Sequence, residues 1–148
     1  MKTYFDHEKL DVYQESIAFC AWVGELLGQI SPKAVAKDQL DRASTSLPLN
    51  IAEGNGKFST VDRARFLEIA RGSALECAAC RDVLVARKLL SSEQMIPAKE
   101  QLVRIVNMLM GMLKGSPHER NSCVKTKDCM QSSRSMSRSR KNAETHVA

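Results

Sequence analysis

Residues 42–79 read RASTSLPLNIAEGNGKFSTVDRARFLEIARGSALECAA, and this stretch decides the fold. It places Pro48 inside a helical pattern of apolar residues and follows it with the break Gly54-Asn55-Gly56. A proline lacks the backbone N–H and its ring collides with the carbonyl four residues earlier, so the stretch predicts a helix kinked near residues 44–47. The residues of the break tolerate positive φ, which predicts that the kinked helix ends there.

The second half of the stretch carries the signal of a helix start. Ser59 followed by Asp62 resembles a capping box, and Phe58 is placed to act as a hydrophobic staple. Upstream, the hydroxyls of residues 44–46 are expected to bond to the carbonyls that Pro48 leaves free. The stretch therefore predicts two consecutive helices joined by a short link.

Apolar residues recur at steps of three and four along four segments, which is the helical period. The segments span residues 8–30, 35–53, 60–89 and 93–114. Short links between them predict an all-α fold, an antiparallel up-down-up-down four-helix bundle with a kinked second helix. The fourth segment is apolar nearly all round from Leu102 to Leu113, so we expect the bundle to bury it by forming an oligomer.

The charge is divided unevenly along the chain. Residues 1–115 hold 15 Lys and Arg against 14 Asp and Glu, whereas residues 116–148 hold 7 against 3. This division predicts a bundle domain over residues 1–115 and a disordered, basic, Ser/Arg-rich tail over residues 116–148, which has too little apolar surface to repay its ordering entropy. The tail is interpreted either as a solvated extension or as an arm that binds phosphates through Arg134, Arg138 and Arg140.

Several classes of function are disfavoured by what the sequence lacks. No run of about 18 apolar residues is present, so we expect no membrane contact. The three histidines do not form Glu-x-x-His motifs, and the sequence has no Gly-rich phosphate loop and no nucleophile elbow. We therefore expect a protein that is not an enzyme and needs no cofactor.

The cysteines indicate packing and a reducing compartment. Cys20, Cys77 and Cys80 fall among periodic apolar residues, where free thiols behave as small hydrophobic side chains. The pair Cys77-x-x-Cys80 has no further ligands at the spacing that zinc requires, so core packing is favoured and no metal is expected. A cytoplasmic protein fits this pattern.

The best candidate phosphate-binding residues of the bundle domain lie at the predicted start of the third helix. Lys57, Arg63 and Arg65 gather there, where the positive end of the helix dipole adds to their field. A solvated surface diluted by Asp62 is the alternative interpretation. Further along the helix, the same basic surface is predicted to extend over Arg81, Arg87 and Lys88.

The motifs of residues 8–114 resemble those of a bacterial four-helix-bundle family, the 23S ribosomal RNA intervening-sequence proteins. The resemblance rests on Leu10-Asp11-Val12-Tyr13, on Gln39-Leu40-x-Arg42-Ala43, on Leu47-Pro48-Leu49-Asn50-Ile51-Ala52-Glu53-Gly54, on Arg65-Phe66-Leu67 and on Gly72-Ser73-Ala74-x-Glu76. A related branch of the family comprises the accessory variability proteins of diversity-generating retroelements.

What the resemblance implies is a ring-like homopentamer without enzymatic activity. In the retroelement branch, such proteins bind a reverse transcriptase and nucleic acid, so the implied function is an accessory protein that binds RNA or an RNA/DNA hybrid. The alternative is a protein-interaction scaffold of the intervening-sequence type with no direct nucleic-acid role. The residues that carry the resemblance around Pro48 and Gly54, which we call the family block, are interpreted as structural. Asn50 and Glu53 are predicted to form a polar lock, in which they pair with a backbone group, with Arg42 or with Arg71. Glu76 can join this lock.

Overall fold

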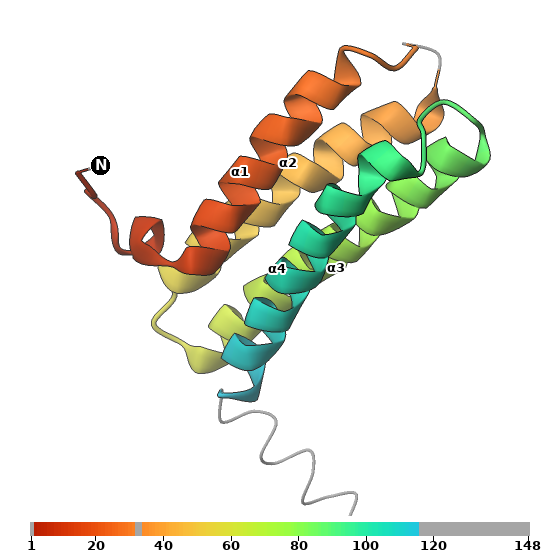
Figure 1. Cartoon of the computed structure of the whole chain (residues 1–148). Coiled ribbons are helices and arrows are strands. Elements are labelled where there is room, and N and C mark those ends of the chain that lie inside the picture. The colour runs from red at the N-terminus through yellow and green to blue at the C-terminus, as the bar shows by residue number, and fades with distance from the viewer. Residues whose placement is uncertain (1, 32–33, 116–148) are drawn as a thin grey trace, which may run out of the picture. The chain divides into compact units, whose positions relative to one another are not determined.

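The computed structural model describes residues 2–31 and 34–115, and this part of the chain forms a four-helix bundle. Figure 1 shows the four long helices side by side, with successive helices running in opposite directions. The predicted all-α up-down-up-down bundle is thereby confirmed. In chain order the elements are η1 (Asp6–Lys9), α1 (Asp11–Leu27), α2 (Val35–Asn55), α3 (Thr60–Ala86), η2 (Glu93–Met95) and α4 (Ile96–Lys114).

One apolar core runs between the four helices. Helices α2 and α3 share the most extensive contact, and α1 and α4 close the bundle against them. Burying a Leu, Ile or Phe side chain stabilises a fold by roughly 1.5–3 kcal/mol. The fully buried side chains come from all four helices and include Phe19, Leu40, Leu47, Ile51, Leu67, Leu84, Ile105 and Leu109.

Helix α2 continues through Pro48 to Asn55, two residues past the predicted end. The proline removes the hydrogen bond to the carbonyl of Ser44, but that residue's hydroxyl donates to the carbonyl of Asp41 at 2.9 Å. The serine hydroxyl thus bonds to a carbonyl that the proline did not free. The kink itself stays a prediction.

The glycine break does end α2, whose last residue is Asn55, but it does so without the positive φ that the sequence predicts. Among the described glycines none has positive φ, and Gly56 closes the helix with φ −79°. Gly54 instead permits close packing, because a Cβ there would lie 3.1 Å from the Cβ of Phe66 and 3.4 Å from the carbonyl oxygen of Arg63. The absence of a side chain at Gly54 lets α2 approach the first turn of α3.

Helix α3 begins as predicted at Ser59, whose Oγ accepts a hydrogen bond from the backbone N–H of Asp62 at 3.3 Å. Phe58 does not form the expected staple, because its side chain is fully exposed at 106%. The helix ends at Ala86, three residues earlier than predicted. Lys88 takes φ 58°, and the N–H of Leu89 then bonds to the carbonyl of Leu84 at 3.0 Å, which is a Schellman closure.

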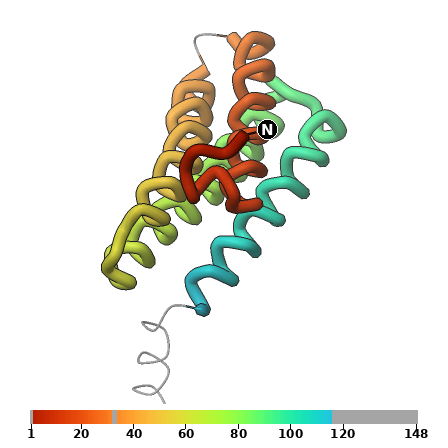
Figure 2. The backbone as a smooth tube through the Cα atoms, turned by 90° about the vertical axis from the view of Figure 1, so that its left-hand side faces the viewer, coloured from red at the N-terminus to blue at the C-terminus, as the bar shows by residue number. Residues whose placement is uncertain are grey.

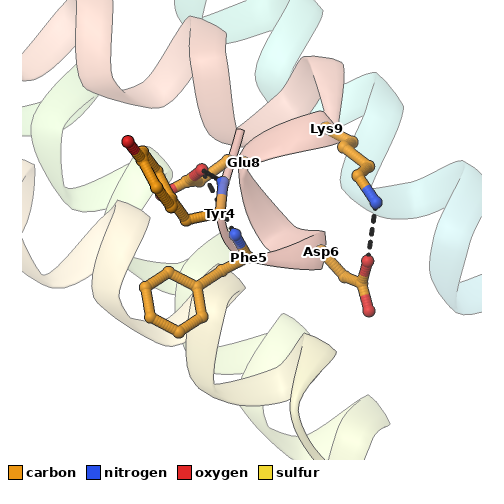
Figure 3. A network of polar contacts seen from close by, with 5 residues as sticks. All are labelled: Tyr4, Phe5, Asp6, Glu8 and Lys9. Atoms are coloured by element: carbon orange, nitrogen blue, oxygen red, sulfur yellow. Dashed lines mark hydrogen bonds and ion pairs between the residues drawn. The ribbon is translucent and has the colours of Figure 1, made fainter. Parts of the chain in front are cut away.

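The chain before α1 folds back against the bundle, where η1 contacts both α1 and α2 (Figure 2). The carboxylate of Glu8 accepts hydrogen bonds from the backbone N–H groups of Tyr4 at 2.6 Å and Phe5 at 3.3 Å (Figure 3). These two bonds lower the pKa of Glu8. The 3₁₀ turn that they support explains why α1 starts at Asp11 and not, as predicted, at residue 8.

None of the helices in the described ranges combines the length and the apolarity that crossing a membrane requires.

Candidate nucleic-acid interface

The three cations at the start of α3 are in different environments. The ammonium of Lys57 lies 3.6 Å from the carboxylate of Glu53 and 4.7 Å from the centre of the Phe66 ring. This ion pair and cation–π contact hold Lys57 against the bundle. Arg63 and Arg65 are exposed, and neither side chain forms an ion pair or hydrogen bond with any part of the chain that the structure describes.

Arg63 and Arg65 do not converge on one point. Each residue of an α-helix turns the chain by about 100°. Arg63 and Arg65 are two residues apart, so their side chains are separated by about 200°, or about 160° the shorter way, around the axis of α3. A single phosphate cannot sit between them. A strand of nucleic acid that passes around this end of the helix can contact both.

Arg81 does not belong to a basic surface, so its predicted role as a surface phosphate ligand is wrong. Arg81 is only 8% exposed. Its guanidinium forms an ion pair with Asp82, and its Nη1 donates a hydrogen bond to the carbonyl of Met95 at 3.4 Å. The hydrogen bond from Arg81 lowers the pKa of Asp82. The residue joins the end of α3 to the start of α4 and acts in the fold.

Arg87 and Lys88 are exposed but lie at the other end of α3. The 24 residues from Arg63 to Arg87 span about 36 Å of helix. Lys88 borders an open depression with Gln29 and Ser92, close to the link between α3 and α4. The predicted basic residues therefore fall into two separate groups and not into one patch.

The family block forms a polar surface on α2 and α3, and only part of it forms the predicted lock. The side-chain amide of Asn50 donates to the backbone carbonyl of Ser46 at 2.8 Å, and the hydroxyl of Ser46 lies 2.9 Å from that of Ser73 on α3. The predicted pairing of Asn50 with a backbone group is confirmed. These contacts link the two helices at mid-height.

The charged members of the block make no lock with one another. Glu53 pairs with Lys57, and Arg71 pairs with Glu68 at 2.7 Å, so the expected Glu53–Arg71 pair is not formed. Arg42 and Glu76 border the same open depression between α2 and α3 without forming an ion pair. Both side chains are exposed.

The two cysteines of the C-x-x-C pair lie in the core. Cys77 is fully buried and Cys80 is 9% exposed. Burial raises the pKa of the Cys77 thiol to about 12 and also raises that of Cys80, so both stay protonated and poorly reactive at neutral pH. The packing role predicted for this pair is confirmed.

Three predicted phosphate ligands, Arg134, Arg138 and Arg140, lie outside the described residues. Sequence reasoning also missed two apolar residues of the surface, Leu49 and Ile69, which are 61% and 42% exposed. The signal was present, because neither residue falls on the apolar stripe of its helix. An apolar residue that lies off the apolar stripe on the helical wheel is expected at the surface, and both residues meet this criterion.

The fold and the surface together define a helical-bundle protein whose exposed features lie along α2 and α3. Comparison with known families shows that the 23S rRNA-intervening sequence protein family matches residues 8–111. The match covers more than half of the chain, so the chain belongs to this family.

A solved structure supports the fold. The chain is similar to the crystal structure of a protein of unknown function from the S23 ribosomal protein family of Bacteroides thetaiotaomicron, with a TM-score of 0.66 and 24% sequence identity. The alignment covers 70% of this chain and 98% of that chain. No curated protein sequence matches the chain.

Proposed function

We propose that this protein is a non-enzymatic accessory protein that binds RNA or an RNA/DNA hybrid as a ring-like homo-oligomer, a homopentamer. In this proposal it assists a reverse transcriptase of a diversity-generating retroelement in the cytoplasm. The free thiols of Cys20, Cys77 and Cys80 agree with a reducing compartment. No step of the proposed function needs a catalytic residue, a metal or a cofactor.

The proposal rests on the exposure of Arg63 and Arg65 and on their lack of ion-pair partners among the described residues. Other basic residues of α3 are engaged, since Arg71 pairs with Glu68 and Arg81 is buried. Arg63 and Arg65 are exposed and lack ion-pair partners in residues 2–31 and 34–115. They are therefore available to neutralise phosphates, and the family takes its name from a ribosomal RNA insertion.

A ring supports this function by repetition. One bundle offers only a few free cations, and its described charges are almost balanced. Affinity for nucleic acid grows with the number of phosphates contacted. A ring repeats Arg63 and Arg65 in every copy, so many weak phosphate contacts add up. Exposed apolar side chains such as Val61, Leu75 and Val103 favour association of the bundles.

The test is a binding titration of the full-length protein with structured RNA and with an RNA–DNA hybrid at several salt concentrations. Affinity should fall steeply with salt, and Arg63→Glu and Arg65→Glu should each weaken binding. Lys99→Glu, the same charge change on exposed α4, is the matched control and should have a smaller effect. Binding that is absent or independent of salt contradicts the proposal.

A protein-interaction scaffold is the second candidate, favoured by the near balance of 15 basic and 14 acidic residues over residues 1–115. Capture of a reverse transcriptase by the tagged protein distinguishes the two. Loss of the captured enzyme after nuclease treatment favours the nucleic-acid function. Capture that survives nuclease, together with no RNA binding, favours the scaffold.

A further inference from the structure

Three residues of α2 form a stripe on the outside of the bundle. Arg42, Leu49 and Glu53 border the same open depression on α2. Arg42 and Glu53 are eleven residues apart, which is three helical turns, so they lie on the same side of the helix. The stripe therefore has Arg42 at one end, an apolar centre that is 61% exposed at Leu49, and Glu53 at the other end. Asp41 also borders the depression but lies about 100° around the helix from Arg42, outside the stripe.

A second stripe on α3 has the same design with the charges reversed. Arg65 and Glu76 are also eleven residues apart, and Ile69, 42% exposed, lies between them. Glu76 borders a depression with Arg42, so the two stripes belong to one surface, which we name the α2–α3 face. Its residues are Arg42, Leu49, Glu53, Arg65, Ile69 and Glu76.

The contact between Ser46 and Ser73 fixes how the stripes are aligned. Because α2 and α3 are antiparallel, a step forward on α2 corresponds to a step back on α3. Arg42 is then level with Glu76, Leu49 is level with Ile69, and Glu53 is level with Arg65. The α2–α3 face thus carries four charges of alternating sign at its corners and two apolar side chains at its centre.

The charges of the face are largely unused within the described part of the chain. Arg42, Arg65 and Glu76 form no ion pair there, and Glu53 has only its 3.6 Å contact with Lys57. An apolar centre with a charged rim is the usual composition of a protein–protein interface. An alternating pattern of four charges also complements itself, since a half-turn brings opposite signs together.

We propose that the α2–α3 face binds the same face of a second copy of this chain around a two-fold axis parallel to the helices. This rotation places α2 of one copy opposite α3 of the other at the same height. Arg42 then meets the partner's Glu76, and Glu53 meets the partner's Arg65. Leu49 packs against the partner's Ile69, so the apolar centre is covered from both sides.

This contact differs from those of the proposed ring. A ring joins two different surfaces head to tail, whereas the α2–α3 contact joins two identical surfaces. If both contacts form, the two-fold contact joins one ring to another, so the oligomer holds more than five chains. The number of chains in the full-length oligomer, measured by sedimentation velocity and light scattering, therefore separates the two proposals.

Two chains support the two-fold contact without the ring, and more than five chains support both. Five chains support the ring alone and overturn the two-fold contact, and a single chain overturns both. Glu76→Arg should reduce the number of chains, to one where the wild type has two and to five where it has more, and should raise the dissociation constant at least about tenfold, because like charges then face each other. Arg65 belongs both to the face and to the proposed phosphate-binding set, so the contact is tested at Arg42 and Glu76, which lie outside that set. RNA affinity is tested at Arg63, which lies outside the face.

Charge exchange tests the pairing directly. The double variant Arg42→Glu with Glu76→Arg should restore the wild-type number of chains, because each new charge again meets its opposite. The double variant Arg42→Glu with Glu53→Arg should not restore it, and Lys99→Glu on α4 should leave it unchanged. Circular dichroism establishes that each variant keeps its helices. A folded Glu76→Arg variant with the wild-type number of chains overturns the inference.

Discussion

At the scale of single residues, Lys88 carries a conformational cost that the fold tolerates. Its φ of 58° lies in the left-handed region, which costs an ordinary residue roughly 1–2 kcal/mol and costs glycine almost nothing. Lys88→Gly should therefore raise the free energy of unfolding by about 1 kcal/mol, measured by urea denaturation. Arg87→Gly, at the neighbouring position with φ −81°, is the control and should lower stability. A destabilised Lys88→Gly protein would contradict this account of the end of α3.

Gly54 and Gly24 are both helical glycines, but their surroundings differ. A Cβ at Gly54 would press on Phe66 at 3.1 Å and on the Arg63 carbonyl at 3.4 Å, whereas one at Gly24 would meet nothing within 4 Å. Gly54→Ala should therefore cost about 1–3 kcal/mol by forcing α2 away from α3. Gly24→Ala should stabilise the protein by about 0.5–1 kcal/mol, since alanine favours helix. Equal effects of the two substitutions in thermal denaturation would show that the close approach of α2 to α3 is unimportant.

Burial of Cys77 should make the free energy of unfolding fall at alkaline pH. Its folded pKa of about 12 exceeds the ordinary value of 9.0 because burial penalises the thiolate. A group whose pKa is raised by folding stabilises fully below its unfolded pKa, so this contribution is present below pH 9 and is lost between pH 9 and pH 12. Urea midpoints should fall over this interval, and less so for Cys77→Ala. Native alkylation at pH 8.5 should spare Cys77, and rapid labelling there would contradict its burial.

At the scale of elements, the segment before α1 depends on one carboxylate. The N–H groups of Tyr4 and Phe5 lower the pKa of Glu8, and a depressed pKa means that the stabilisation is present above pH 4.5 and is lost as the pH falls through the folded value. Acidification should therefore release the segment while α1 to α4 remain folded. The protection of the Tyr4 amide, which is its exchange rate relative to that of an unfolded peptide at the same pH, should be lost at low pH, and Glu8→Ala should cause the same loss at neutral pH.

Asp6→Asn is the matched control for this prediction, because Asp6 only pairs with Lys9 on the exposed side of η1 at 2.9 Å. Its amide exchange at Tyr4 should match that of the wild-type protein. Protection of the Tyr4 amide that persists as the pH falls far below 4.5, or that persists in Glu8→Ala, would show that other contacts hold the segment.

The helices were predictable from the sequence, and their ends were less so. Apolar spacing places all four, because each helix buries one stripe in the core. The start of α1 depends on hydrogen bonds to Glu8, and the end of α3 depends on a lysine in a conformation typical of glycine. Gly54 and Gly56 stand where α2 ends, as predicted, but both have ordinary φ. Local composition does not reveal whether a glycine serves the backbone or a neighbouring helix.

The candidate site was predictable in its parts and not in its arrangement. Charge and position found Arg63 and Arg65, which are exposed. The same reasoning included Arg81, whose burial depends on the link to α4 and on the carbonyl of Met95. The position of Arg42 and Glu76 at one depression, and the packing of α2 against α3 in general, are set by tertiary register. Sequence spacing along one helix carries no information about that register.

At the scale of the whole molecule, the charge balance separates the two parts of the chain. Residues 1–115 are almost neutral, so binding by the bundle depends on where its free arginines lie and on how many copies assemble. Residues 116–148 carry 7 basic and 3 acidic residues, which gives them most of the net charge of +5. Two contributions to nucleic-acid binding, from α3 and from the tail, are thus expected to be separable.

Salt dependence measures the two contributions on one scale. Each phosphate contacted adds roughly 0.7–0.9 to the slope of log affinity against log salt. Replacing Arg134, Arg138 and Arg140 together with Gln should lower this slope by roughly 2–3 if each arginine of the tail contacts a phosphate. Replacing Ser132, Ser135 and Ser137 with Ala keeps every charge and should leave the slope unchanged. A slope that falls only with Arg63→Glu and Arg65→Glu would assign binding to the bundle alone, because a solvated tail releases no counterions from the nucleic acid.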